Sequence, residues 1–388
     1  MHRGARLRAA REAAGVGLRE MARLTHYSPA YLSLVECGKR PVPPAVAAAY
    51  GAVLGELADG DPAGAEWVAR VAASDVCGAT LERLETAVDD LAVAYAMTPP
   101  AELLVDIRRQ LGGAARLLAG RTTLVQHRRL LVAAGWLALL AGTCHVDLGH
   151  RRAADVRLRA AREIARECEH REIAAWTLET RAWQHLVDRE FGVAAELSEA
   201  ARRMAPGGGS ARIQATAQRG RALARLGDSA GSYGALRGVA RLVSGLRAPE
   251  RPEHHFRYDP AKADAYVATT LSWLGDPAAE SYARHVLLDL ERAACVRPRR
   301  IAMARLDLGL ALVAAGKPEE ATDVALAVVT SGRLVPSHHW RVADVVAAIG
   351  QRDRRGRAPG GARGAGANTL PPAPGRWPNR PEHPAPPG

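Results

Sequence analysis

The stretch LRAAREAAGVGLREMARLTHYSPAYLSLVECGKRP, from Leu7 to Pro41, decides how the first part of this 388-residue chain folds. Alanine, leucine, arginine and glutamate dominate it, apolar residues recur at intervals of three and four, and glycine and proline interrupt it. This pattern predicts a compact block of short helices. Three prolines, Pro41, Pro43 and Pro44, close the block, and one further helix is expected from about Ala45 to Leu57.

The same helical pattern continues through most of the chain, and the alternating pattern of strands is missing, so the fold class is predicted to be all-α. An amphipathic stretch with apolar residues from Leu81 to Tyr95 predicts a helix that ends at Thr98-Pro99-Pro100. Another helix is expected from Ala101 to about Leu118.

A set of positions in the first block follows the pattern of a known DNA-binding domain. They are Arg11, Val16, Met21, Ala22, Ser28, Leu32, Val35, Glu36 and Gly38. With them, about the first 55 residues closely resemble the phage-repressor-like (Xre-type) helix-turn-helix regulators, in a form of the actinobacterial type. The resemblance implies a five-helix domain in which Arg11 and Glu36 form a partly buried ion pair. It also implies that Ser28 caps the third helix and that Gly38 provides a left-handed turn after it.

The resemblance also implies how the domain meets DNA: the third helix, here about Pro29 to Val35, enters the major groove, and Lys39 and Arg40 contact phosphates. The candidate DNA-contacting residues are Arg19, Ser28, Pro29, Ala30, Tyr31, Ser33, Leu34, Lys39 and Arg40. The outward positions of the helix include no Arg, Gln or Asn for bidentate base contacts. Leu18 replaces a glutamine common in the family, which Arg19 offsets only in part. Sequence choice is therefore expected to depend on methyl and hydroxyl contacts and on DNA shape.

Residues from roughly Thr122 to Ile349 show weak internal similarity. Turn signals recur at Gly149, Glu190-Phe191-Gly192, Gly227, Gly275 and Gly316, each between two apolar helices. Such periods predict stacked helical hairpins, because a single hairpin cannot bury its apolar faces alone. Segments such as LGHRRAAD and AGKPEEAT resemble the central turn of tetratricopeptide repeats, which implies a right-handed superhelix. Small residues, Ala154, Ala195, Ser232 and Ala321, are expected where the helices pack closely.

The predicted organisation is therefore a helix-turn-helix domain at residues 1–57, connecting helices at 58–121, a tetratricopeptide-like domain at 122–349 and a tail at 350–388. The tail holds nine Pro and eight Gly and is expected to be disordered. Of the net charge of +12, residues 1–57 carry +4 and the tail +5, so the positive field lies at the two ends, where it could meet phosphates.

A solenoid of hairpins presents a concave groove, which is a natural binding surface. Candidates for its lining are Trp136, Trp176, Arg181, His254, His255 and Tyr258, with Trp183, Gln184 and Tyr266 as further members. Trp176 and Trp183 lie seven residues apart and share a face, which also fits packing between hairpins. The two histidines belong to an insert, Arg247 to Pro260, that either caps the groove and touches ligand or packs outside with solvated histidines.

No nucleophile, metal or phosphate-loop motif occurs, so we expect no enzymatic activity, no catalytic residues, no metal site and no cofactor. Five scattered cysteines indicate a reducing compartment. No export signal and no run of about 18 apolar residues is present, so no membrane association is expected, and the predicted location is the cytoplasm, at the nucleoid.

These features predict a sequence-specific transcription regulator that binds double-stranded DNA as a homodimer. The resemblance implies that its repeat domain senses a peptide or small-molecule effector, or mediates dimerisation and partner binding. The alternative is a repeat-domain adaptor whose degenerate helix-turn-helix no longer reads DNA. Salt dependence of DNA binding through Lys39, Arg40 and Arg19 discriminates the two.

Overall fold

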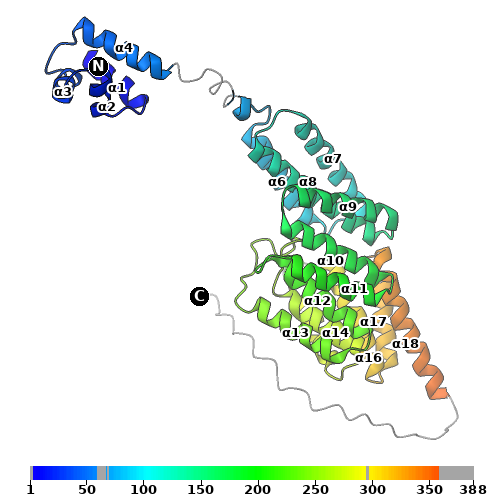
Figure 1. Ribbon diagram of the computed structural model, residues 1–388. Coiled ribbons are helices and arrows are strands. Elements are labelled where there is room, and N and C mark those ends of the chain that lie inside the picture. The colour runs from blue at the N-terminus through cyan, green and yellow to red at the C-terminus, as the bar shows by residue number, and fades with distance from the viewer. Residues whose placement is uncertain (1–2, 59–66, 68–69, 294–296, 358–388) are drawn as a thin grey trace.

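The structure is a computed structural model that describes residues 3–58, 67, 70–293 and 297–357. This part of the chain contains seventeen α-helices and one short 3-10 helix and no strand, which confirms the predicted all-α class (Figure 1).

The first four helices are α1 (Arg3–Ala13), α2 (Leu18–Thr25), α3 (Pro29–Glu36) and α4 (Pro44–Ala58). They share a small core around Met21, Leu32, Val35 and Tyr50, all of which are buried. Both α1 and α2 pack against α3 and α4. The sequence predicts five helices for this domain; four of them are described up to Ala58, and residues 59–66 and 68–69 lie outside the described part.

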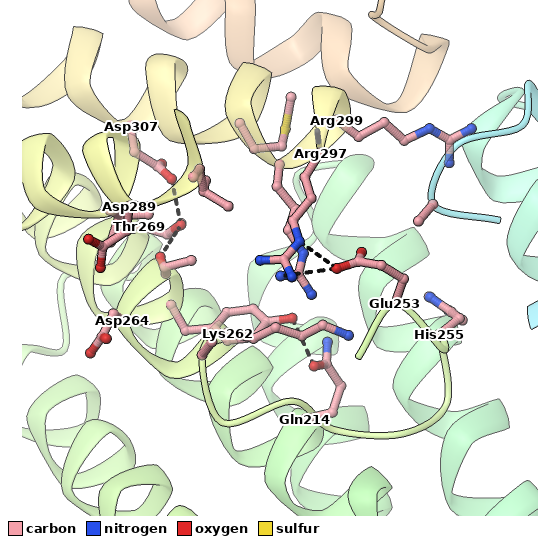
Figure 2. A pocket seen from close by; sticks show the side chains of 18 of the residues that line it. Gln214, Glu253, His255, Lys262, Asp264, Thr269, Asp289, Arg297, Arg299 and Asp307 are labelled. Atoms are coloured by element: carbon pink, nitrogen blue, oxygen red, sulfur yellow. Dashed lines mark hydrogen bonds and ion pairs between the residues drawn. The ribbon is translucent and has the colours of Figure 1, made fainter. Parts of the chain in front are cut away.

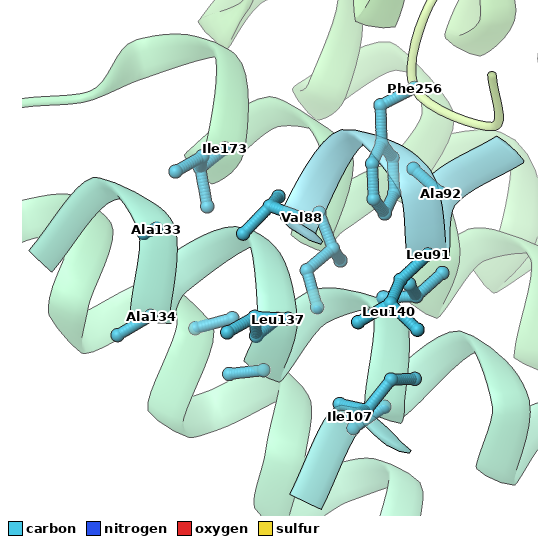
Figure 3. Packing of buried hydrophobic residues seen from close by; sticks show 14 of the residues in the cluster. Val88, Leu91, Ala92, Ile107, Ala133, Ala134, Leu137, Leu140, Ile173 and Phe256 are labelled. Atoms are coloured by element: carbon cyan, nitrogen blue, oxygen red, sulfur yellow. The ribbon is translucent and has the colours of Figure 1, made fainter. Parts of the chain in front are cut away.

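Helices α6 (Gly78–Ala94) and α7 (Pro100–Ala119) pack against α8 (Leu124–Asp147), which begins at a capping box between Thr123 and Gln126. Figure 3 shows Leu137 and Leu140 of α8 beside Leu91 of α6 and Ile107 of α7. Contrary to expectation, α8 is long and apolar enough to cross a membrane, but 83% of its most apolar window is buried inside the protein. Such burial is typical of a core helix.

Five helical hairpins follow one another from α8 to α17 (Figure 1). The further helices are α9 (Arg151–Glu167), α10 (Arg171–Val187), α11 (Phe191–Met204), α12 (Ser210–Arg225), α13 (Ser229–Val243), α14 (Lys262–Leu274), α15 (Ala279–Arg292), α16 (Pro298–Ala314) and α17 (Pro318–Thr330). The two helices of each hairpin pack against each other, and both pack against the first helix of the next hairpin. The predicted repeat-like packing of consecutive helices is confirmed.

The five turns share one backbone feature, a left-handed residue that ends the first helix of each hairpin. Four of them are glycines, Gly149, Gly227, Gly275 and Gly316, and the fifth is Arg189. The prediction of five turns is confirmed, but the second turn is centred two residues earlier than Phe191, because Arg189 adopts the left-handed conformation.

This shift changes the close-packing position in the second hairpin. Ala154, Ser232 and Ala321 are fully buried five residues after their turn residue, and counting from Arg189 the same position is Ala194, which is fully buried. Ala195 is only half-buried, so its assignment to the close-packing position was wrong by one residue.

The end of the chain returns to its beginning. The 3-10 helix η1 (Pro336–His338) contacts α8, and α18 (His339–Arg357) packs against α16 and α17. Buried Asp147 at the end of α8 accepts hydrogen bonds from Tyr95 Oη (2.7 Å) and Ser337 Oγ (2.9 Å), and the Arg299 guanidinium lies 3.3 Å away. These contacts close the array of hairpins.

Helix α18 extends to Arg357, past residue 350 where the tail was expected to begin. The remainder of that expected tail, residues 358–388, lies outside the described residues.

The close-packing position predicts that substitutions at two alanines of α17 differ strongly in their effect on stability. Ala321→Leu forces a larger side chain into a fully buried contact and is expected to destabilise the repeat region by about 1–3 kcal/mol. Ala327→Leu, on the exposed face of the same helix, is the matched control and should change stability by less than about 0.5 kcal/mol. Thermal unfolding followed by circular dichroism measures both; equal midpoints would contradict the assignment.

Candidate nucleic-acid interface and ligand cavity

A buried ion pair fixes α1 against the end of α3. Arg11 Nε and Nη2 donate to the two carboxylate oxygens of Glu36 at 2.7 and 2.8 Å, and Arg11 Nη1 donates to the carbonyl of Val16 at 2.8 Å. Tyr50 Oη of α4 donates to the same carboxylate at 2.8 Å. Burial alone would raise the pKa of Glu36, but the hydrogen bonds from Arg11 and Tyr50 outweigh it and hold the pKa below its usual value.

Two residues that support the contact between α1 and α3, Tyr50 and Gly4, were not identified from the sequence. Tyr50 completes the hydrogen bonding of Glu36, and burial together with that carboxylate raises the pKa of its phenol. Gly4 is buried where α1 crosses α3, and a Cβ atom there would overlap the carbonyl oxygen of Val35. An exposed tyrosine and a buried one look alike in sequence, and a glycine that permits close approach resembles any other glycine.

The N-terminus of α3 is capped and its outer side is accessible. Ser28 Oγ accepts a hydrogen bond from the backbone N–H of Tyr31 (3.2 Å), and Pro29 occupies the first helical position. Gly38 follows the helix with φ +73°. Pro29, Ala30 and Leu34 are exposed and Ser33 is half-buried, so the candidate base-contacting side chains face away from the core.

Three cations beside this helix form no ion pair in the described residues. Arg19 of α2 and Lys39 and Arg40 after α3 are all exposed, and Arg40 lies over the ring of Tyr31 at 5.6 Å. By contrast, Arg23 on α2 is paired with Glu20. Unpaired guanidinium and ammonium groups beside an exposed helix are suited to phosphate oxygens.

Residues 4–60 match a family model described as a helix-turn-helix domain. The N-terminal block is a helix-turn-helix domain. No curated protein matches the chain. A helix-turn-helix domain places its third helix in the major groove of DNA, which indicates at a coarse level that the chain is a DNA-binding regulator.

A cavity of about 560 Å³ lies inside the closed array of hairpins. Side chains from α10, α12, α14 and α16 line it, together with the insert before α14, the N-terminus of α16, η1 and α18. Figure 2 shows Arg297, Glu253 and His255 on one side, with Lys262 reaching towards them, and Asp264, Asp289 and Asp307 on the other. Its volume lies in the range of small-molecule sites.

The insert packs inside rather than outside the array. Phe256 is buried against Trp136 (ring centroids 4.8 Å), and His255 lies 4.4 Å from Tyr95 and lines the cavity. Burial lowers the pKa of His255 to about 3, so the ring is neutral. The interpretation of an outer loop with solvated histidines was therefore wrong, because three aromatic residues of the core, Tyr95, Trp136 and Trp176, pack against His255 and Phe256 of the insert.

The sequence-predicted groove residues divide between two hollows. Trp176 and His255 line the main cavity, whereas Trp136 and His254 line a smaller one of about 250 Å³ with Arg257. Tyr258 stacks on Tyr266 at 6.4 Å and lines neither, and Arg181 is half-buried on α10 and lines neither. Of the further candidates, Trp183 and Tyr266 line the main cavity, whereas Gln184 is buried on α10 and lines neither hollow.

The charged residues of the cavity were missed by sequence reasoning. Lys262, Arg297 and Arg300 face the hollow, and burial lowers the pKa of Lys262 to about 8. Behind the lining residue Gln214, buried Glu179 accepts a hydrogen bond from its amide (3.1 Å), and burial raises the pKa of Glu179 to about 7. An Arg-rich chain offers no pattern that separates buried cations from the many exposed ones. No group of three metal-ligating side chains occurs among the described residues.

Loss of the Arg11–Glu36 ion pair is predicted to lower the stability of the helix-turn-helix domain strongly. Arg11→Met leaves the Glu36 carboxylate buried without its cation, which is expected to cost about 3 kcal/mol or more. Because the pKa of Glu36 is lowered in the folded protein, the contribution of this group is present above about pH 4.3 and is lost as the pH falls below it.

Hydrogen exchange of the backbone amides in α1 to α4 of the full chain measures this cost. The matched control is Arg8→Met on the same helix, which removes an exposed pair with Glu12 and should leave exchange unchanged. Equal exchange rates in the two variants would contradict the structural role of Arg11.

Proposed function

We propose that this protein is a sequence-specific transcription regulator of the Xre type, acting on double-stranded DNA in the cytoplasm as a homodimer and controlled by a small effector. The observation that carries the proposal is the helix-turn-helix domain with Arg19, Lys39 and Arg40 exposed and unpaired beside the outer face of α3. A decayed domain would have no reason to keep three such cations together at the expected phosphate side.

Effector control is supported by the cavity and by its connection to α6. The insert places Glu253 and His255 in the cavity, and the same segment contacts α6 through Arg251 with Asp90 (2.8 Å) and Arg257 with Asp89 (3.0 Å). Its backbone also donates from His255 to the carbonyl of Ala92 (3.0 Å). A molecule that moves the insert would act directly on α6, the first long helix after the helix-turn-helix domain.

The hairpins that enclose the cavity resemble tetratricopeptide repeats, and we propose that they form the sensing half of the regulator. We propose no catalytic role for this half. An adaptor function without DNA binding is the competing outcome of the first experiment below.

Removal of the two cations after α3 should weaken DNA binding without regard to sequence. Genomic fragments enriched on the wild-type protein supply the duplex, and the Lys39→Ala/Arg40→Ala variant is expected to reduce affinity for every duplex. The slope of log affinity against log salt concentration should fall by about 2, since each phosphate contact contributes about 0.9.

The matched control is Arg305→Ala/Lys317→Ala, which removes the same two charge types from the repeat region, where they pair with Glu291 and Glu280. It should bind the duplex as the wild type does. If the wild type enriches no fragment, or if both double variants bind equally, DNA recognition by this face is refuted and partner capture by an adaptor takes its place.

A second expectation concerns assembly. One short recognition helix provides few contacts, and a dimer engages two half-sites about 34 Å apart. Sedimentation equilibrium at micromolar concentration should give twice the 41.2-kDa chain mass, with one duplex bound per dimer. A single-chain mass with and without DNA would contradict the homodimer.

A further inference from the structure

The cavity contains more positive than negative charge at the end where α14 and α16 begin. Arg297 Nε lies 2.6 Å from Glu253, and Arg300 reaches only to 3.8 Å from Glu253 and 3.6 Å from Asp259. Lys262, largely buried, lies in the same group. Three cations therefore face two carboxylates, and one positive charge is left without a counter-charge within the group.

Two of these cations have donors that the protein does not use. No side chain in the described residues accepts a hydrogen bond or forms an ion pair with the Lys262 ammonium, and Arg300 Nη2 is buried without a hydrogen-bond partner. Of the other cations of the wall, Arg299 pairs with Asp147 and Arg341 with Asp307, while Arg221 stacks on Tyr266. Buried donors without partners are costly, so their retention beside a cavity indicates a ligand that accepts from them.

Part of the remaining wall is aromatic and apolar, and another part carries Asp264, Asp289 and Asp307. Tyr266 presents its ring with the Arg221 guanidinium stacked at 4.5 Å, and Trp176 and neutral His255 lie 5.9 Å apart. Met303 and Leu290 add apolar surface to the same lining. Such walls bind flat rings by stacking and by burial of apolar area.

We propose that the cavity binds a small molecule with a planar aromatic body and one anionic group, held by Lys262 and Arg300. The ring body lies along the wall of Tyr266 and Trp176, and the oxyanion replaces the missing counter-charge. This inference rests on the proposed function in one respect: the ligand would be the effector of the regulator. Binding of the ligand to the cavity does not depend on DNA. A volume of about 560 Å³ fits one such molecule.

A matched pair of fluorescent probes tests the proposal on the full chain. 8-Anilinonaphthalene-1-sulfonate carries the anion, and N-phenyl-1-naphthylamine is the same aromatic body without it. The wild type should bind one sulfonate probe per chain. Lys262→Met keeps the length of the side chain and removes its charge, and it should weaken the sulfonate probe about tenfold or more while changing the neutral probe less than about twofold.

Arg300→Gln should act in the same direction. The control variant is Lys317→Met, an exposed lysine paired with Glu280 away from the cavity, and it should leave both probes unaffected. Because Lys262→Met removes a buried charge without a partner, we expect it to be at least as heat-stable as the wild type, so loss of binding cannot be ascribed to unfolding. Circular dichroism melting checks this.

Competition identifies the oxyanion. Displacement of the probe by 2-naphthoate or by 2-naphthyl phosphate supports the proposal and assigns a carboxylate or a phosphate, whereas displacement by neither overturns it. Equal weakening of both probes by Lys262→Met, or wild-type binding that is insensitive to it, also overturns it. DNA binding is measured separately, so a protein that binds DNA but not the sulfonate probe refutes the ligand class alone.

Discussion

The buried carboxylate of Asp147 is the interaction on which the shape of the repeat region depends. It stands at the end of α8 and takes hydrogen bonds from Tyr95 Oη, at the end of α6, and from Ser337 in η1, with Arg299 of α16 as its counter-charge. Burial raises the pKa of Asp147 in spite of these partners. A carboxylate in such a place must be paired from several sides, and its partners are drawn from both ends of the array. The hairpins therefore close around a cavity instead of forming an open groove.

Sequence reasoning reached the fold because the fold depends on local patterns. Apolar spacing predicts helices, and four glycines identify four of the five hairpin turns. The remaining turn, the second in chain order, was predicted two residues too late, because Arg189 adopts the left-handed conformation that glycine usually takes. An arginine gives no sequence signal for this conformation. Position Ala194 was missed for the same reason, since the close-packing position is counted from the turn.

The candidate sites were harder to predict from the sequence than the fold. Lys262 and Arg300 lie 38 positions apart in sequence and meet only because α14 and α16 are adjacent in the array. The sequence left open whether the insert caps the groove or packs outside the array. In the structure its charged residues, Arg251 and Arg257, turn outward to α6 while Phe256 and Tyr258 are buried. Such a division between neighbouring residues follows from tertiary contacts that no period in the sequence encodes.

The cations of this Arg-rich chain fall into two classes with different consequences. Arg11 and Arg341 are buried and Arg299 is half-buried, and each pairs with a buried carboxylate, so these cations hold elements of the fold together. Lys39 and Arg40 are exposed and unpaired, and Lys262 is buried and unpaired. The cost of an unpaired cation is small in water and large in a cavity. The exposed pair therefore costs the fold little, whereas the charge of Lys262 opposes folding unless an anion offsets it. The insert links that lysine to α6 through contiguous contacts, because Glu253 lies in the cation group and Arg251 two residues earlier binds Asp90. In the proposed mechanism, an anion at Lys262 would compete with Glu253 for the same guanidinium groups, and that competition would be the step by which occupancy of the cavity reaches α6.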